Sequence, residues 1–264
     1  MLTLIFIILT TFVQAAPLRI TITEGVSEPL PYAAPTFIGE TGASIEMALK
    51  ITEVVKVDLN GTGLFREVPS SSYISSVDTF SSPIQYSDWR AINVQALLIG
   101  SVLVTTENLS VKLRIIDVFS NKELGEVLEI NFNKKKWRRG AHKIADIVYS
   151  RITGEQGYFD SRVAYVSETG KKGSREKRLA IMDFDGENLE YLTDGSYMVL
   201  APRFSSKGDR ILYTSYQTGT PQIYMKELAT SKITVFKNRK GTMSFAPRFS
   251  PCLLYTSDAA DDRV

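Results

Sequence analysis

Short stretches in which apolar and polar residues alternate recur along this chain, and such alternation is typical of half-buried β-strands. The pattern predicts a strand over residues 18–23 and a hairpin made of residues 111–118 and 126–132, joined through residues 120–122. The continuous apolar run 96–100 predicts a buried strand. The first half of the chain is therefore expected to contain a β-sheet.

Apolar residues at helical spacing predict two long helices, over residues 44–59 and 141–152. Ser44 is the predicted N-cap of the first helix, because serine side chains satisfy free amide groups at helix starts, and Gly61 marks its end. Gly154 is the predicted terminator of the second helix.

Loops and one shorter helical turn connect these elements. A helical turn is predicted over residues 88–93, and the serine-rich segment 70–86 is predicted to be a loop with room for one short strand. Pro29 and Pro31 are assigned to a loop after the first strand. Strands and helices mix throughout, which predicts an α/β N-terminal domain over residues 16–157.

The second half of the chain repeats itself. Residues 201–205 and 246–250 both read Ala-Pro-Arg-Phe-Ser, 45 residues apart, and the strand-like segments 162–167 and 210–215 are alike at an offset of 48. A period of this length, made of short strands and turns, is typical of β-propeller blades. Blades bury their faces against neighbours in a ring, so more than one is needed.

Other features of this half fit the same architecture. A further strand is predicted at 222–225, and Gly186 and Gly208 fall where tight turns between antiparallel strands need glycine. A basic insertion over residues 170–178 explains the difference between the two offsets. Residues 158–251 are therefore predicted to form a partial all-β propeller of about two blades, one of them complete.

The start of the chain carries the pattern of an export signal. Residues 2–13 form an apolar run that is followed by Val13-Gln14-Ala15, a small-residue cleavage site, so residues 1–15 are predicted to be a signal peptide cut after Ala15. The run is shorter than the roughly 20 residues that a membrane-spanning helix needs. No lysine or arginine precedes it, which leaves a buried N-terminal helix as the alternative.

The last residues, 252–264, look foreign to the protein. They resemble the translation of a sequencing adapter, and Pro247 precedes Leu253 by 6 positions, whereas Pro202 precedes Ile211 by 9. The repeat thus predicts that the native sequence ends near Pro251. Without this tail the chain has no cysteine, which excludes disulfides and thiolate metal sites.

Composition narrows the function only slightly. The 264 residues are 44% hydrophobic and 23% charged, which is ordinary for a globular protein, and a net charge of +2 gives no argument for nucleic acid. The basic run 134–139 contains Trp137 and has two interpretations. It either contacts phosphates or an anionic surface, or forms a solvated connection between strand and helix with Trp137 as its anchor.

Isolated residues offer little support for catalysis or metal binding. His142 is the only histidine, no Gly-x-Ser-x-Gly elbow accompanies it, and it is interpreted as a polar residue at a helix start. Asp183, Asp185 and Gly186 resemble the start of a calcium loop, but the later ligands of an EF-hand are absent. A hairpin turn inside a blade is the preferred interpretation.

The alternating segment 18–25 begins the predicted mature chain. Terminal strands either dock in their own domain or add to the sheet edge of a partner. The sequence leaves both possibilities open.

Together these segments resemble the TolB family, periplasmic propeller proteins of the Tol–Pal system in Gram-negative bacteria. The resemblance runs from about residue 17 to 251. The segments that carry it are 19–26, 137–142 with Asp146, 152–154, Phe159 with 162–166, 182–188 and 192–193.

This resemblance implies a non-enzymatic scaffold without cofactors, nucleic acid or a small-molecule substrate. In the family the propeller has six blades and engages the Pal lipoprotein, which gives peripheral association with the outer membrane, while an N-terminal segment engages TolA. The role implied is support of outer-membrane invagination during cell division and of envelope integrity. The TolA-facing segment would comprise Leu18, Arg19, Ile20, Thr21, Ile22, Thr23, Glu24, Gly25 and Val26.

Two other functions fit a propeller-containing chain. One is the propeller of a serine peptidase, which requires a hydrolase domain beyond residue 251. The other is a generic sugar- or ligand-binding propeller.

Overall fold

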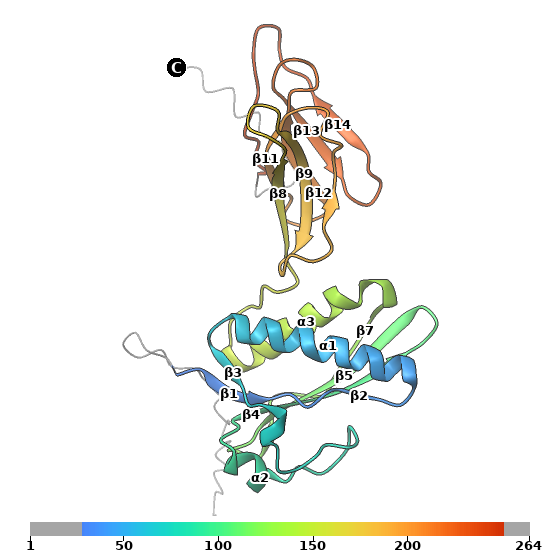
Figure 1. Cartoon of the computed structure of the whole chain (residues 1–264), viewed down its shortest axis with the longest axis vertical. Coiled ribbons are helices and arrows are strands. Elements are labelled where there is room, and N and C mark those ends of the chain that lie inside the picture. Colours follow the sequence, from blue (N-terminus) through green and yellow to red (C-terminus); the bar gives the residue numbers. More distant parts are fainter. Residues whose placement is uncertain (1–27, 251–264) are drawn as a thin grey trace, which may run out of the picture. The chain divides into compact units, whose positions relative to one another are not determined.

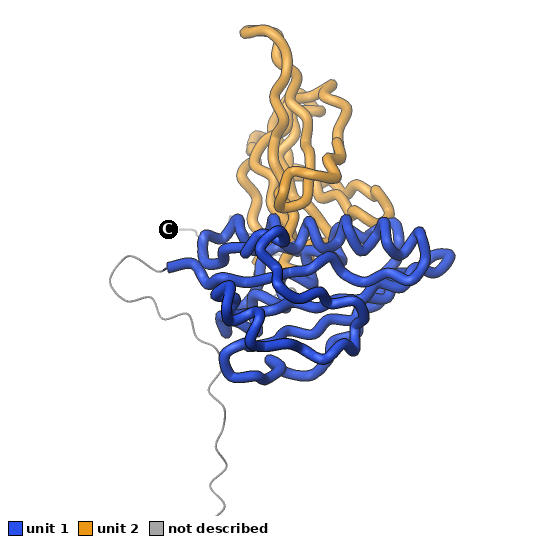
Figure 2. Tube along the Cα trace, turned by 60° about the horizontal axis from the view of Figure 1, so that its bottom comes forward, with its two compact units in different colours: residues 1–160 blue, residues 161–264 orange. Residues whose placement is uncertain are grey.

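A computed structural model describes residues 28–250 in two compact units, which divide after Asp160 (Figure 2). The predicted signal segment 1–15, the predicted strand 18–23 and the predicted tail 252–264 lie outside the described residues. Each unit has a hydrophobic core of its own.

Unit 1 is an α/β domain built on one mixed sheet (Figure 1). The strand order is β3-β1-β4-β5-β6, and β2 and β7 pair with β4 and β5. Strand β1 is parallel to β3 and β4, and β2 is parallel to β4. Strand β5 is antiparallel to both β4 and β7. The elements are β1 (Leu30–Ala33), β2 (Ile38–Gly39), α1 (Gly42–Gly61), β3 (Phe65–Glu67), the 3-10 turn η1 (Ser70–Ser72), α2 (Tyr86–Ala91), β4 (Ala96–Val104), β5 (Asn108–Asp117), β6 (Lys122–Glu123), β7 (Leu128–Asn133), the 3-10 turn η2 (Lys134–Lys136) and α3 (Trp137–Thr153).

Helices α1 and α3 cover one face of this sheet (Figure 1) and enclose the larger core cluster, which includes Ile51, Leu98 and Ile144. A second cluster, around Trp89 and Leu97, lies on the other face. The α/β class and the predicted hairpin are thereby confirmed. The segment 70–86 forms the predicted loop with a 3-10 turn and no strand.

Helix α1 begins earlier than predicted, and its N-cap is Thr41 rather than Ser44. The Thr41 hydroxyl accepts a hydrogen bond from the Ser44 amide at 3.2 Å. Ser44 is buried instead, where its hydroxyl accepts from the amide of Val104 at the end of β4, at 3.1 Å. The sequence pattern misplaced the cap because the helical spacing of large apolar residues starts only at Ile45 and Gly42 is unfavourable in helices.

The sequence predicted that Pro31 lies in a loop, and this prediction was wrong: Pro31 lies in strand β1. Proline removes a ladder donor and is normally excluded from central strands. Here pairing with β4 starts only at Tyr32, opposite Ala96. Pro31 contributes its carbonyl alone, which accepts from the Gln95 amide at 2.8 Å. The N–H group that proline lacks is therefore not needed, because the paired residues of β1 and β4 start one position later, at Tyr32.

Helix α3 starts at Trp137, one turn before the predicted residue 141. Its C-terminus is capped as predicted by Gly154, whose φ of 79° is left-handed and whose amide bonds the Ser150 carbonyl. The predicted apolar face is confirmed for Ile144, Val148 and Ile152, which are buried against the sheet.

Unit 2 consists of two antiparallel sheets, as expected for propeller blades. One has three strands in the order β10-β9-β8, and the other has four in the order β11-β12-β13-β14, a complete blade. The strands are β8 (Arg162–Thr169), β9 (Glu176–Asp183), β10 (Glu190–Tyr191), β11 (Val199–Phe204), β12 (Arg210–Ser215), β13 (Gln222–Glu227) and β14 (Ile233–Phe236). The predicted basic insertion is shorter than expected, because β9 already begins at Glu176.

The two copies of Ala-Pro-Arg-Phe-Ser share an uncommon backbone conformation. Ala201 has φ 51° and Ala246 has φ 53°, both in the left-handed region that L-residues other than glycine rarely adopt. At Ala201 this interrupts the β11–β12 pairing, whose register shifts between Leu200 and Arg203. The repeat therefore preserves a local backbone shape as well as a sequence.

The core of unit 2 lies between its two sheets and contains Leu179, Ile211, Tyr213 and Tyr224. The predicted glycine turns are confirmed, with φ of 88° at Gly186 and 66° at Gly208. A side chain in these left-handed conformations would be strained.

Candidate functional site

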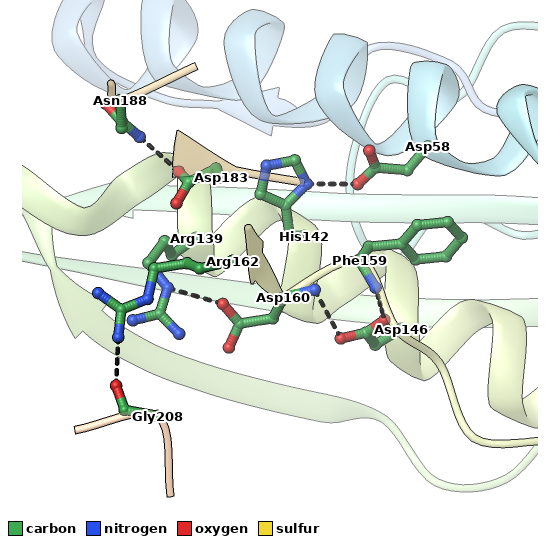
Figure 3. Close-up of polar contacts among 10 residues, drawn as sticks. All are labelled: Asp58, Arg139, His142, Asp146, Phe159, Asp160, Arg162, Asp183, Asn188 and Gly208. Atoms are coloured by element: carbon green, nitrogen blue, oxygen red, sulfur yellow. Dashed lines mark hydrogen bonds and ion pairs between the residues drawn. The ribbon is translucent and has the colours of Figure 1, made fainter. Parts of the chain in front are cut away.

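The segment predicted to face a partner, residues 18–26, lies outside the described residues, so its role stays a prediction. The described chain begins at residue 28 and enters β1 at Leu30, in the interior of the sheet. Several polar side chains on α3 and on the segment that follows it make hydrogen bonds or ion pairs (Figure 3).

His142 is buried in the interior of unit 1, which corrects its interpretation as a polar residue at a helix start. It lies in the second turn of α3 and is 1% exposed. Its Nδ1 atom lies 2.7 Å from Oδ2 of Asp58 on α1, which is 3% exposed (Figure 3). A buried carboxylate needs such a partner, because an unpaired buried charge is costly. The pair joins the two helices that cover the sheet.

Sequence reasoning missed this pair, although each partner left a signal. Asp58 lies between Val55 and Leu59 on the apolar face of α1, and His142 precedes Ile144 on that of α3. A polar residue at a core position usually requires a partner. The sequence offered no means of matching one helix to the other.

Asp146 holds the segment that leaves α3 toward unit 2. Its carboxylate accepts hydrogen bonds from the amides of Phe159, at 2.6 Å, and Asp160, at 3.1 Å (Figure 3). Burial raises the pKa of the Asp146 carboxyl, and these two amides oppose that rise only in part. Gly157 is required beside it, because a Cβ there would lie 2.4 Å from Oδ1 of Asp146.

Further contacts fix the same segment to unit 1. Asp160 accepts from Arg139 on α3, with Nε–Oδ1 at 2.8 Å. Phe159 is 1% exposed and packs edge-on against Tyr149, with ring centroids 5.8 Å apart. The chain is therefore held to α3 up to the last residue of unit 1. We call Arg139, Asp146, Phe159 and Asp160 the linker clasp.

The remaining sequence candidates have structural roles. Asp183 and Asn188 belong to a hairpin turn, in which the Asn188 amide donates to Asp183 at 2.5 Å and the Gly186 amide donates to the Asp183 carbonyl at 3.0 Å. This confirms the predicted hairpin turn. Trp137 packs against the core of unit 1 and anchors the basic run, as the connection interpretation predicted.

In unit 2, Arg162 at the start of β8 crosses to the neighbouring sheet. Its guanidinium donates to the Gly208 carbonyl at 2.5 Å (Figure 3) and lies 5.3 Å from the ring centroid of Phe204. The Arg162 guanidinium thus makes two contacts with the next blade: a hydrogen bond to the turn at Gly208 and a cation–π contact with Phe204.

No helix within residues 28–250 combines the length and apolarity that crossing a membrane requires.

Comparison with known proteins gives the same two-part division. A model described as the TolB amino-terminal domain matches residues 18–124, and one described as the TolB beta propeller domain matches residues 149–253. Curated relatives called Tol-Pal system protein TolB include that of Roseobacter denitrificans, 56% identical over 88% of this chain and 52% of the relative. That of Dinoroseobacter shibae is 58% identical over 80% and 48%.

Among solved structures, TolB from Acinetobacter baumannii superposes with a TM-score of 0.68 at 25% identity, over 79% of this chain and 49% of that one. The chain thus spans about half the length of the curated relatives it matches.

Proposed function

Because this chain belongs to the TolB family, we propose that it acts as a partner-binding scaffold of the Tol–Pal system in the periplasm. The observation that carries the proposal is the succession, in one chain, of an α/β domain and propeller blades, each matched by its own TolB model.

The proposed division of labour follows these two units. The propeller engages the Pal lipoprotein, and through it the protein associates with the outer membrane. The segment 18–26 engages TolA of the inner-membrane complex. Such a bridge supports invagination of the outer membrane during division and the integrity of the envelope. No chemistry is required of the protein for this role.

The test is direct binding by the full-length protein. We expect isothermal titration calorimetry to detect binding to the soluble domain of Pal and to the periplasmic domain of TolA. Removal of residues 16–26 should abolish TolA binding and leave Pal binding unchanged. A matched control replaces residues 18–26 by the same residues in scrambled order, which keeps length and charge and should also lose TolA.

Two results would count against the proposal. Binding of neither domain by the unaltered protein would overturn it. Full TolA affinity in the scrambled variant would overturn the role of the segment alone.

A further inference from the structure

The segment that connects the two units, residues 154–160, has the composition of a flexible linker. It reads Gly-Glu-Gln-Gly-Tyr-Phe-Asp, and segments rich in glycine and polar residues commonly connect domains loosely. In the structure its two glycines have the opposite effect, because each of them allows the segment to be held against helix α3.

Backbone amides along this segment donate hydrogen bonds to α3. The Gly154 amide donates to the backbone carbonyl of Ser150 at 2.9 Å, and the Gly157 amide donates to the hydroxyl of the same serine at 3.1 Å. The next two residues bound in this way are those whose amides the Asp146 carboxylate accepts (Figure 3). Each of these bonds fixes backbone dihedrals that a flexible linker would leave free.

Gly157 also brings the segment into direct contact with the backbone of α3. A Cβ at this position would lie 2.5 Å from the Cα atom of Asp146, which is closer than carbon atoms can approach. The φ of Gly157 is not positive, so this position needs glycine for space and not for an unusual conformation. The two backbones therefore pack on each other with no side chain between them.

The chain is fixed to unit 2 immediately after this segment. The carbonyl of Ser161 accepts a hydrogen bond from the Phe184 amide at 3.1 Å, and strand β8 begins at Arg162 and pairs with β9 along its length. The amide of Asp160 is bound to unit 1, and the carbonyl of the next residue is bound to unit 2. Between these two anchored groups lie the rotatable backbone bonds of the Asp160–Ser161 junction.

We propose that the linker clasp makes residues 154–160 a rigid part of unit 1, so that unit 2 moves relative to unit 1 by rotation at the Asp160–Ser161 junction. Hinges in proteins are typically a few residues at the ends of elements, which absorb the change in φ and ψ. This inference goes beyond partner binding, because it concerns how the two units are coupled. Opening of the clasp would add seven residues of free chain, with a reach of roughly 25 Å.

The first test is residue-resolved amide hydrogen exchange in the full-length protein. We expect the amides of Phe159 and Asp160 to exchange at least about 100-fold more slowly than in an unstructured peptide. Asp146→Ala should raise these two exchange rates about tenfold or more and leave those of strand β9 unchanged. If these amides exchange in the unaltered protein as fast as in an unstructured peptide, the inference is overturned.

A second variant opens the clasp without changing any of its side chains. Gly157→Ala places a methyl group against the backbone of Asp146, so the same two amides should lose protection. The matched control is Gly61→Ala at the end of α1, where a Cβ would meet no atom within 4 Å and φ is not positive. The control should leave the exchange of Phe159 and Asp160 unchanged. Tryptophan fluorescence shows whether unit 1 is folded in each variant.

The second test measures the motion itself by double electron–electron resonance. Spin labels at Glu53→Cys in α1 and Thr230→Cys between β13 and β14 occupy exposed positions in the two units, with any other cysteine replaced by serine. The distribution of label distances should broaden about twofold or more in Gly157→Ala and stay unchanged in Gly61→Ala.

The two measurements together decide the inference. Faster exchange in Gly157→Ala without a broader distance distribution would show that the clasp does not restrict the motion between the units, and the inference would be wrong. Neither measurement uses Pal or TolA, so the result is independent of the proposed function.

Discussion

His142 Nδ1 and Asp58 Oδ2 lie 2.7 Å apart although 84 residues separate them in the chain. Both side chains are almost fully buried, and they join α3 to α1 over the same face of the sheet. Removing one partner of a buried pair leaves the other polar group buried without a hydrogen-bond partner. The stability lost in this way is larger than the net stability that the intact pair contributes.

We therefore expect Asp58→Ala to lower the free energy of unfolding of unit 1 by about 3 to 5 kcal/mol. Both tryptophans of the chain, Trp89 and Trp137, belong to unit 1, so urea unfolding followed by tryptophan fluorescence reports on this unit within the whole protein. Glu53→Ala on the exposed side of α1 is the control and should change stability by about 0.5 kcal/mol or less. Equal effects of the two substitutions would contradict a structural role for the pair.

Asp146 should make the stability of unit 1 depend on pH in a direction opposite to most carboxylates. Because its folded pKa is raised above 3.8, the folded state keeps this proton to higher pH than the unfolded state does. Its contribution is therefore favourable at low pH and declines as the pH rises through the folded pKa. Asp146→Asn removes this decline.

Urea unfolding by tryptophan fluorescence at a series of pH values from about 4 to 7 would measure this difference. Stability of the variant relative to the unaltered protein should increase with pH. A relative stability that falls over this range would show that the pKa is lowered and that the two amide hydrogen bonds outweigh burial. Glu129→Gln, at an exposed carboxyl on β7, serves as the control.

Ala201 should be more stable as glycine. Its φ of 51° is left-handed, a conformation that costs a residue with a Cβ about 1 kcal/mol and costs glycine little. Ala201→Gly is expected to raise the midpoint of the thermal transition of unit 2 in calorimetry. Ala229→Gly, at an alanine whose φ is not positive, should lower it or leave it unchanged. A lower midpoint for Ala201→Gly would mean that the left-handed backbone is not kept in solution.

Arg162 should stabilise the contact between the two sheets of unit 2. A hydrogen bond from a charged group contributes about 1.5 to 3 kcal/mol, and Arg162→Ala removes it together with the stacking on Phe204. Arg162→Lys should restore only part of the loss, because an ammonium group lacks the planar surface that stacks on the ring. The calorimetric transition of unit 2 measures both. Full recovery by lysine would show that only the charge matters.

The elements whose signal is local were predictable, and those that depend on distant partners were not. Alternation in residues 111–118 and 126–132 predicted the hairpin, and the spacing of Ile144, Val148 and Ile152 predicted the buried side of α3. The burial of His142 depends on Asp58, which no local pattern connects to it.

The assignment of Pro31 failed for a related reason. Proline favours loops in general, and only the position at which the β4 ladder starts makes it acceptable in β1. The linker clasp was not predicted either, because Asp146 accepts hydrogen bonds from backbone amides 13 and 14 residues away. Every residue other than proline has a backbone amide, so the sequence does not indicate which amides a side chain will bind.

The left-handed alanines also limit how this protein can vary. Ala201 and Ala246 occupy one position of the repeat, and in that conformation each added atom at Cβ increases the steric conflict, most of all for branched side chains. Among substitutions, glycine and then asparagine or aspartate are the ones this backbone accepts. In a library of all residues at both positions, variants with valine, isoleucine or threonine should therefore be the first to be lost in a selection for folded protein. The same few residue types would then be accepted at this position of each blade as the family diverges.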